Sequence, residues 1–248
     1  MPKPSAIDEF IDLANVAYRN VYDKFHLSAV RESANPVPKL AGSCFKVSQS
    51  PAPHVNSVEV HGALLVNRLP YKRKQSSSGG AATASEGIHV ILDSLDIYKF
   101  NGAPSLKNSF LYKSNVHLGY YVRQKTKWRP LLYVRYDFAS AKDAHPLFHA
   151  QICEGALEGP SAQEFGEIPE IVDLLKVHKS IRLPSANVIG ATALVSLAAD
   201  HLPINSFHEI LHVVQKQPFF KDWRCDCTSL DVADSVTKMI SSGWYGSN

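Results

Sequence analysis

Apolar residues recur at two different spacings, which divide the chain into helical and strand regions. Between residues 5 and 25 they return every three or four positions, behind a Ser5 and Asp8 pair that resembles a capping box. This segment is predicted to be an amphipathic helix. β-rich runs then predict a short strand near residues 44–47 and longer strands at residues 58–69, 88–100, 110–122, 130–138 and 146–152.

Helical spacing returns in the last third of the chain. Helices are predicted at residues 169–177, 185–202, 206–215 and 229–240. Strands grouped together with helices after them indicate an α+β protein, in which a central antiparallel sheet carries an amino-terminal helix and a helical carboxy-terminal third. We expect one domain over residues 1–248, sheet-rich across 40–153 and helical across 165–242, with an exposed Ser- and Gly-rich loop at residues 71–87.

Composition narrows the class of protein. Hydrophobic residues make up 45% of the chain and charged residues 20%, values that exclude a wholly disordered chain. The longest apolar run, residues 191–199, falls well short of the roughly 20 residues that a membrane span needs. Because residues 1–11 also lack the pattern of a secretory signal, a cytoplasmic location without a membrane partner is expected.

Charge is unevenly distributed, although the net charge is only +3. From residue 97 to residue 136 there are eight Lys or Arg residues, interleaved with aromatic side chains, and no Asp or Glu. Such a stretch is typical of a surface that contacts phosphates and stacks bases. Its densest part is predicted to be a hairpin tip formed by Arg123, Lys125, Lys127, Trp128 and Arg129. The alternative is a structural pairing of charges with the acidic segment 143–173.

Two neighbouring strand candidates share the same alternation. In residues 131–138 and 146–152 the even positions are mostly apolar, so the even face is predicted to be buried. Antiparallel pairing would then gather four ionisable groups on the opposite face, namely Arg135, Asp137, His145 and His149. This cluster could bind a phosphate, hold a metal or move protons, and the alternative is a solvated structural ion-pair network.

Residues 133–138 (YVRYDF) and 145–149 (HPLFH) also carry a resemblance. They resemble segments of uncharacterised bacterial proteins, some of which are found near phage-defence genes. The resemblance implies a bacterial setting and transfers no catalytic role.

Residues 208–212 read HEILH, the zinc-protease pattern in which His208 and His212 bind the metal and Glu209 activates water. Against zinc, Ser206 with Glu209 three positions later also fits a capping box at a helix start. A catalytic zinc needs a third protein ligand as well, and no His or Glu follows His212. A capped surface helix is therefore favoured, and zinc remains the alternative to an expectation of no cofactor.

These patterns favour a binding or accessory protein that contacts nucleic acid or nucleotide phosphates through a basic, aromatic sheet face. The resemblance implies that this protein is bacterial and acts in a phage-defence setting. Two other classes stay open. One is a zinc-dependent hydrolase using residues 208–212, and the other is a structural subunit that binds a protein partner. The patterns do not decide whether the protein is an enzyme.

Overall fold

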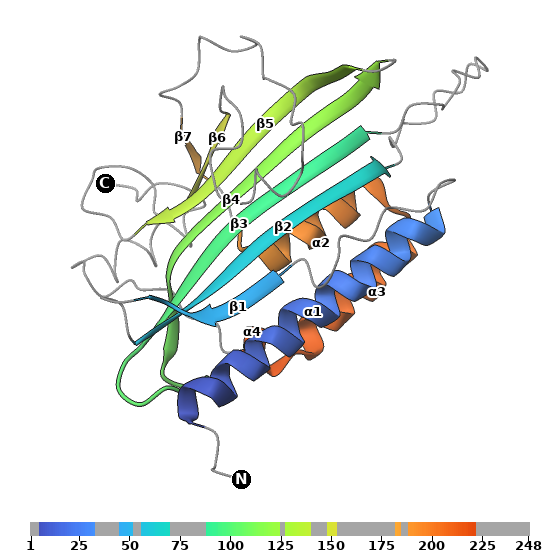
Figure 1. The fold of residues 1–248 in the computed structure, drawn as a ribbon. Helices are drawn as coiled ribbons and strands as arrows, with labels where there is room; N and C mark the ends of the chain where they lie inside the picture. The colour runs from blue at the N-terminus through green and yellow to red at the C-terminus, as the bar shows by residue number, and fades with distance from the viewer. Residues whose placement is uncertain are drawn as a thin grey trace, which may run out of the picture.

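The chain folds as a seven-stranded antiparallel sheet with helices packed on one of its faces (Figure 1). The computed structural model describes residues 5–32, 45–51, 56–69, 88–124, 127–139, 148–152, 182–184 and 188–221. Each strand pairs with its neighbour in the chain, so the sheet order is the sequence order, β1 to β7. The α+β class with a central antiparallel sheet is thereby confirmed.

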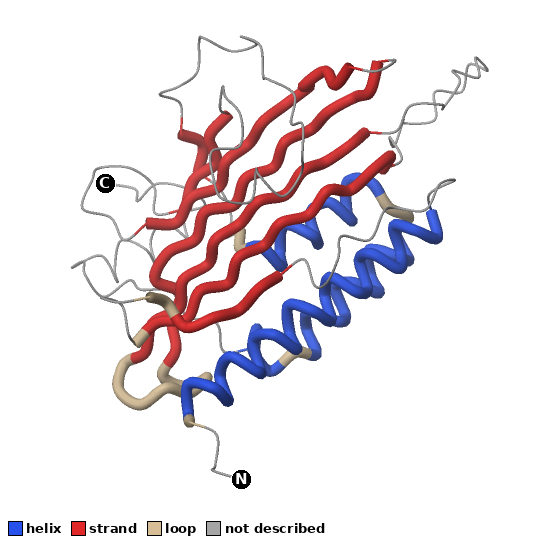
Figure 2. The backbone as a smooth tube through the Cα atoms, in the orientation of Figure 1, coloured by secondary structure: helices blue, strands red, loops and turns tan. Residues whose placement is uncertain are grey.

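Strands β1 to β6 begin and end close to the predicted limits, β3 matches its predicted range in full, and β7 was not predicted. Their bounds are β1 (Phe45–Gln49), β2 (Ser57–Leu69), β3 (Ile88–Phe100), β4 (Ser109–Gln124), β5 (Lys127–Ala139), β6 (Phe148–Ile152) and β7 (Arg182–Pro184). Figure 2 shows the strands as one continuous layer with the helices on one side. The alternation of apolar and polar residues predicted these strand limits well because one face of the sheet is buried under the helices.

Four helices are described: α1 (Ala6–Glu32), α2 (Gly190–His201), α3 (Ile204–Lys216) and the short α4 (Pro218–Lys221). The helices predicted at residues 169–177 and 229–240, and the loop predicted at residues 71–87, lie outside the described residues. Within the described part of the chain, no helix combines the length and the apolar character that a membrane crossing requires.

Helix α1 starts at the predicted capping box and is longer than predicted. The Ser5 amide and hydroxyl donate to the Asp8 carboxylate at 3.1 and 2.6 Å, and the Asp8 amide donates to the Ser5 hydroxyl at 3.3 Å. These bonds satisfy amides that a helix start leaves unpaired. The helix continues to Glu32 because its buried stripe continues through Phe25 and Ala29.

The core lies between the even-numbered face of β2 and β3 and the helices. Buried apolar residues of this face alternate with less buried ones along most of both strands, although residues 88–92 are all buried. They include Val58, Val60, Leu64, Val66, Val90, Leu92 and Tyr98. From α1, the ring of Phe10 packs edge-on against Phe100 at 4.8 Å, and Tyr18 packs against Phe45 at 4.9 Å. Helix α4 adds Phe219, whose ring lies 5.2 Å from that of Tyr98.

One carboxylate, that of Asp96, lies inside this core and is fully buried. Its Oδ1 accepts a hydrogen bond from the Ser114 hydroxyl at 2.6 Å. Its Oδ2 accepts from the Tyr18 hydroxyl and from the Gly190 amide, both at 2.9 Å. Since Tyr18 gives its only proton to Asp96, it accepts a further bond from Tyr98 at 2.7 Å. Asp96 therefore joins β3 to α1, to β4 and to the first residue of α2.

Helix α2 starts at Gly190, five residues later than predicted, because Ile189 is extended and forms its N-cap. The helix start packs directly on the sheet. A Cβ atom at Gly190 would lie 2.5 Å from the Ser94 hydroxyl and 2.8 Å from the Phe45 ring, so a larger residue would push the helix away. The close approach allows the Gly190 amide, at the positive end of the helix, to reach the Asp96 carboxylate.

Burial raises the pKa of Asp96 to about 6, although the hydrogen bonds from Ser114, Gly190 and Tyr18 act in the opposite direction. The folded protein therefore binds the Asp96 proton more tightly than the unfolded chain does. Its contribution to stability is complete at pH values below the ordinary pKa of Asp and is lost as the pH rises through 6, a difference of roughly 3 kcal/mol.

We predict that the Asp96→Asn variant unfolds more easily than the wild type, since its amide nitrogen cannot accept the bonds that Asp96 accepts. The difference in unfolding free energy between the two proteins should shrink as the pH rises from 4 to 7, because only the wild type loses the Asp96 contribution. Denaturant titrations at several pH values measure this difference. A Tyr18→Phe variant is the control: it removes one donor to the charged form, so its pH dependence should persist and move to higher pH. A constant difference between wild type and Asp96→Asn across this range would contradict the assignment.

Candidate functional site

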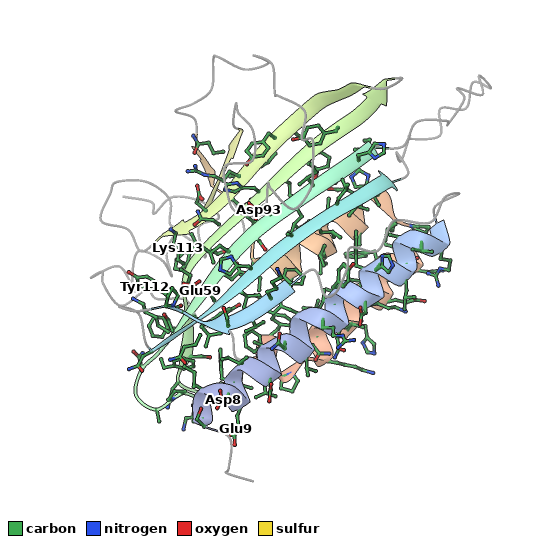
Figure 3. The ribbon with its side chains drawn as sticks, in the orientation of Figure 1. Asp8, Glu9, Glu59, Asp93, Tyr112 and Lys113 are labelled. Atoms are coloured by element: carbon green, nitrogen blue, oxygen red, sulfur yellow. The ribbon has the colours of Figure 1, made fainter. Side chains whose placement is uncertain are left out.

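Polar side chains occupy the sheet face opposite the helices, which we call the second face. The strand register places Glu59 and His61 of β2, Asp93 of β3, and Lys113, Asn115 and His117 of β4 on it, followed by Arg135 and Asp137 of β5. Figure 3 shows Glu59, Asp93, Tyr112 and Lys113 on these strands, away from the helical layer. Both signs of charge are present on this face.

The predicted pair Arg135 and Asp137 forms the best-defined site on the second face. The Arg135 Nε donates to Asp137 Oδ2 at 2.5 Å, and the Asn115 side-chain amide donates to Asp137 Oδ1. The Asp137 side chain is 6% exposed, whereas that of Arg135 is 39% exposed. Asp137 thus fixes the Nε edge of the Arg135 guanidinium. With the residues that the structure describes, the terminal nitrogens of Arg135 make no hydrogen bond.

The structure describes the backbone of one of the two histidines in the predicted cluster and neither of their side chains. The register pairs Asp137 directly with His149 across β5 and β6, so the predicted antiparallel pairing is confirmed at the backbone. The side chain of His149 and the whole of His145 lie outside the described residues. Their part in the cluster therefore stays a prediction.

The predicted burial of the even face of β5 is only partly correct. Phe138 is buried, but Leu132 is 39% exposed, while the odd residues Tyr133 and Asp137 are buried. The reason is that α1 and α2 pack against β1 and β3 rather than against β5. Alternation on a strand predicts which residues share a face, but the position of the helical layer decides which face is covered.

A second group on this face surrounds His117, which the sequence analysis did not single out. The Tyr133 hydroxyl lies 2.7 Å from His117 Nδ1, and the register pairs His117 with Asp93 on one side and with Arg135 on the other. The alternation that identified Arg135 could have identified His117, because both occupy odd positions of paired strands. The hydrogen bond with Tyr133 fixes the orientation of the imidazole beside the guanidinium.

A bulge in β4 brings a basic and an aromatic group together at the end of β4 nearest the β3–β4 turn. Lys113 pairs with Ile97 and Leu111 with Tyr98, so Tyr112 is the extra residue. The Lys99 ammonium lies 3.3 Å from the centre of the Tyr112 ring, a cation–π contact. Lys113 is exposed beside it.

The predicted hairpin tip is confirmed at the level of the backbone. Strands β4 and β5 pair up to Gln124 and Lys127, which leaves a two-residue connection at residues 125–126. Arg123 pairs with Trp128 and Val122 with Arg129, and these pairs extend past Ile88, where β3 begins. The side chains of residues 122–130, and Lys125 as a whole, lie outside the described residues, so their exposure stays a prediction.

The HEILH segment lies on α3, which packs beside α1. Helix α3 starts at Ile204 after Pro203, so the predicted start at Ser206 with a capping box is wrong. Ser206 is instead buried in the first turn, where its hydroxyl accepts a hydrogen bond from Arg31 of α1 at 2.6 Å. Pro203 displaces the start because its fixed backbone favours a position at the beginning of a helix.

Glu209 has a structural partner in α1. Its carboxylate lies 2.7 Å from the Lys24 ammonium and 3.6 Å from the Arg31 guanidinium. The hydrogen bond from Lys24 and its charge hold the pKa of Glu209 below its ordinary value. His208 and His212 are exposed on the same helix. Among the described residues, no group of three or more His, Cys, Asp or Glu side chains could hold a metal ion.

Comparisons of the chain with protein-family models, with curated proteins and with solved structures gave no match.

The HEILH segment gives a direct test of metal binding. We predict that His208→Ala and His212→Ala change the unfolding free energy by less than about 0.5 kcal/mol, because both side chains are exposed. Ser206→Ala should cost roughly 1–2 kcal/mol, because the Arg31 guanidinium loses a buried acceptor. Thermal or denaturant unfolding measures these changes.

Elemental analysis of the same proteins tests the zinc alternative. Near-stoichiometric zinc that disappears from both histidine variants, with the fold retained, would establish the metal site and contradict a purely structural role for this helix.

Proposed function

We propose that the protein binds a phosphate-bearing ligand, and specifically nucleic acid, along the second face of the β4–β5 hairpin. The observation that carries the proposal is the guanidinium of Arg135, which is half exposed and held at Nε by the buried Asp137 carboxylate. The other groups of the site extend this contact along the hairpin.

The Arg135 guanidinium is suited to phosphate because its geometry is fixed before a ligand arrives. Asp137 holds one edge, and Asn115 holds Asp137 in turn, so little side-chain entropy remains to be lost on binding. The terminal nitrogens form a planar fork that matches two oxygens of a phosphate. The imidazole of His117, fixed by Tyr133, stands at the neighbouring cross-strand position.

Further basic groups lie along the same two strands. Lys113 and the Lys99–Tyr112 contact lie toward one end of β4, and the Arg123–Trp128 pair lies at the other. Lys113 and Arg123 are ten positions apart, which in a strand is about 33 Å, long enough for several nucleotides of an extended strand. A ribbon with basic groups at both ends and an anchored Arg135 between them fits an elongated polyanion better than a single small anion.

The acidic groups on the second face limit the expected affinity. Glu59 lies within hydrogen-bond distance of His61, at 3.1 Å, and Asp137 forms an ion pair with Arg135, so each of these carboxylates has a partner on the same face. With a net charge of only +3, binding should be moderate and strongly weakened by salt. The setting that we propose, accessory binding in bacterial phage defence, is based only on the resemblance of residues 133–149.

The hairpin gives the first test. We predict that Arg123→Gln combined with Lys127→Gln weakens binding to a labelled single-stranded oligonucleotide. The magnitude of the slope of log affinity against log salt should fall by up to about 2, because fewer counterions are released when two phosphate contacts are lost. Fluorescence anisotropy at several salt concentrations measures both quantities. The matched control is Arg19→Gln with Lys216→Gln, which removes the same charge from exposed positions of the helical layer. A wild-type protein that fails to bind the oligonucleotide even at low salt refutes the proposal.

Arg135 gives the second test. We predict that Arg135→Lys lowers affinity about tenfold while the salt slope stays nearly unchanged, because the charge is kept and the fork is lost. Unchanged affinity in this variant, alongside a weakened hairpin variant, would remove Arg135 from the site and leave only the hairpin.

A further inference from the structure

Helix α1 exposes an apolar stripe on the side that does not face the sheet. Leu13 is 43% exposed, Val16 54% and Leu27 65%. These are three of the five large apolar side chains that are exposed among the described residues. Together with the polar residues Asn20 and Asp23 they follow a spacing of three and four residues, so these five positions form one continuous line along the helix, apolar at three of them.

The outer positions of this stripe are symmetric about Asn20. Leu13 and Leu27 lie seven residues before and after it, which is two helical turns in each direction. Glu9 and Arg31 lie eleven residues before and after it and carry opposite charges. A second α1 placed antiparallel across Asn20 would therefore bring leucine to leucine and carboxylate to guanidinium.

We propose that α1 binds a second copy of this chain, with the two α1 helices antiparallel and crossing at Asn20. A two-fold axis requires a surface that is complementary to itself, and the outer positions of this stripe meet that requirement, Leu13 with Leu27 and Glu9 with Arg31. Glu9 lies at the amino-terminal end of α1 (Figure 3) and would face the partner copy near its Arg31, whose side chain is 53% exposed. The antiparallel arrangement also pairs the opposite ends of the two helix dipoles.

Contacts among the described residues leave the stripe accessible on its outer side. Helix α3 packs along one flank of α1, where Lys24 contacts Glu209 and Asn20 contacts Gln217 at 3.3 Å. Ile204, at the start of α3, is 59% exposed two residues before Ser206, which contacts Arg31. It adds an apolar side chain at the end of the stripe where Glu9 of the second copy would arrive.

The expected dimer is weak and depends on concentration. A helix of 27 residues is about 40 Å long, and one helix pair buries an area near the low end of stable interfaces. The polar Asn20 at the centre costs stability but fixes the register, as buried polar residues do in paired helices.

Sedimentation equilibrium of the full chain, from low to high micromolar concentration, tests the proposal. The wild type should shift from monomer to dimer, and Leu13→Glu with Leu27→Glu should raise the dissociation constant at least about tenfold. Because both side chains are exposed, this variant should fold normally, which its thermal unfolding checks. The control, Leu132→Glu, changes another exposed leucine, on β5, and should dimerise as the wild type does.

A cysteine at the crossing point tests the geometry. Under mild oxidation Asn20→Cys should form a disulfide-linked dimer, whereas Asp12→Cys, exposed on α1 but away from the axis, should behave as the wild type with its native cysteines. A wild-type chain that stays monomeric at the highest concentration overturns the proposal. The proposal is also overturned if the Leu13→Glu, Leu27→Glu variant still dimerises as the wild type does. A third contradicting result is a disulfide that forms as readily in Asp12→Cys as in Asn20→Cys.

Discussion

The buried carboxylate of Asp96 is the interaction on which the rest of the structure depends. A charge inside a protein core is costly unless hydrogen bonds surround it, and here the three donors come from three different elements. Tyr18 belongs to α1, Ser114 belongs to β4, and Gly190 is the first residue of α2. Apolar packing alone would tolerate sliding of a helix on a sheet, whereas these bonds are satisfied in one arrangement only. The hydrogen bonds to Asp96 thus set the position of the helical layer on the sheet.

The position of the helical layer in turn separates the two sides of the molecule. Helices α1 and α2 pack over β1 and β3, so the even-numbered residues of β2 and β3 form the core and the opposite face carries the polar groups. The α1–α3 contacts through Glu209 and Ser206 complete this layer. The sheet face that we propose for ligand binding and the α1 stripe that we propose for self-association therefore belong to different sides, and one does not block the other.

Asp96 and Asp137 show how the same residue type has two roles in one sheet. Both are buried carboxylates that accept bonds from neighbouring strands or helices. Asp96 is bound by neutral donors, so burial dominates and its pKa rises. Asp137 is bound by the Arg135 guanidinium, a permanent cation, and it orients that cation toward the surface. The first carboxylate stabilises the fold, and the second prepares a group for binding.

Local patterns in the sequence determined strands β1 to β6, the start of the first helix and the pairing of β5 with β6. These features depend on residues close together in the chain: alternation sets which side chains share a face, and Ser5 with Asp8 sets a helix start. The sequence also indicated that Arg135 and Asp137 share a face, because both occupy odd positions of the same strand. It missed Asp96, although an acidic residue among Val90, Leu92 and Tyr98 on an apolar face was a signal.

Tertiary structure alone decided what each polar residue contacts. Glu209 and Ser206 fitted a helix cap on spacing, but their partners are Lys24 and Arg31 of α1, and 175 residues separate Arg31 from Ser206. In the same way the donors of Asp96 come from residues 18, 114 and 190, a separation that no local pattern encodes. The even face of β5 was predicted to be buried, and it is so only in part, since burial requires a covering element and the helices pack mainly elsewhere. Periodicity specifies the faces of an element, and the packing of distant elements specifies which faces are covered and which charges meet.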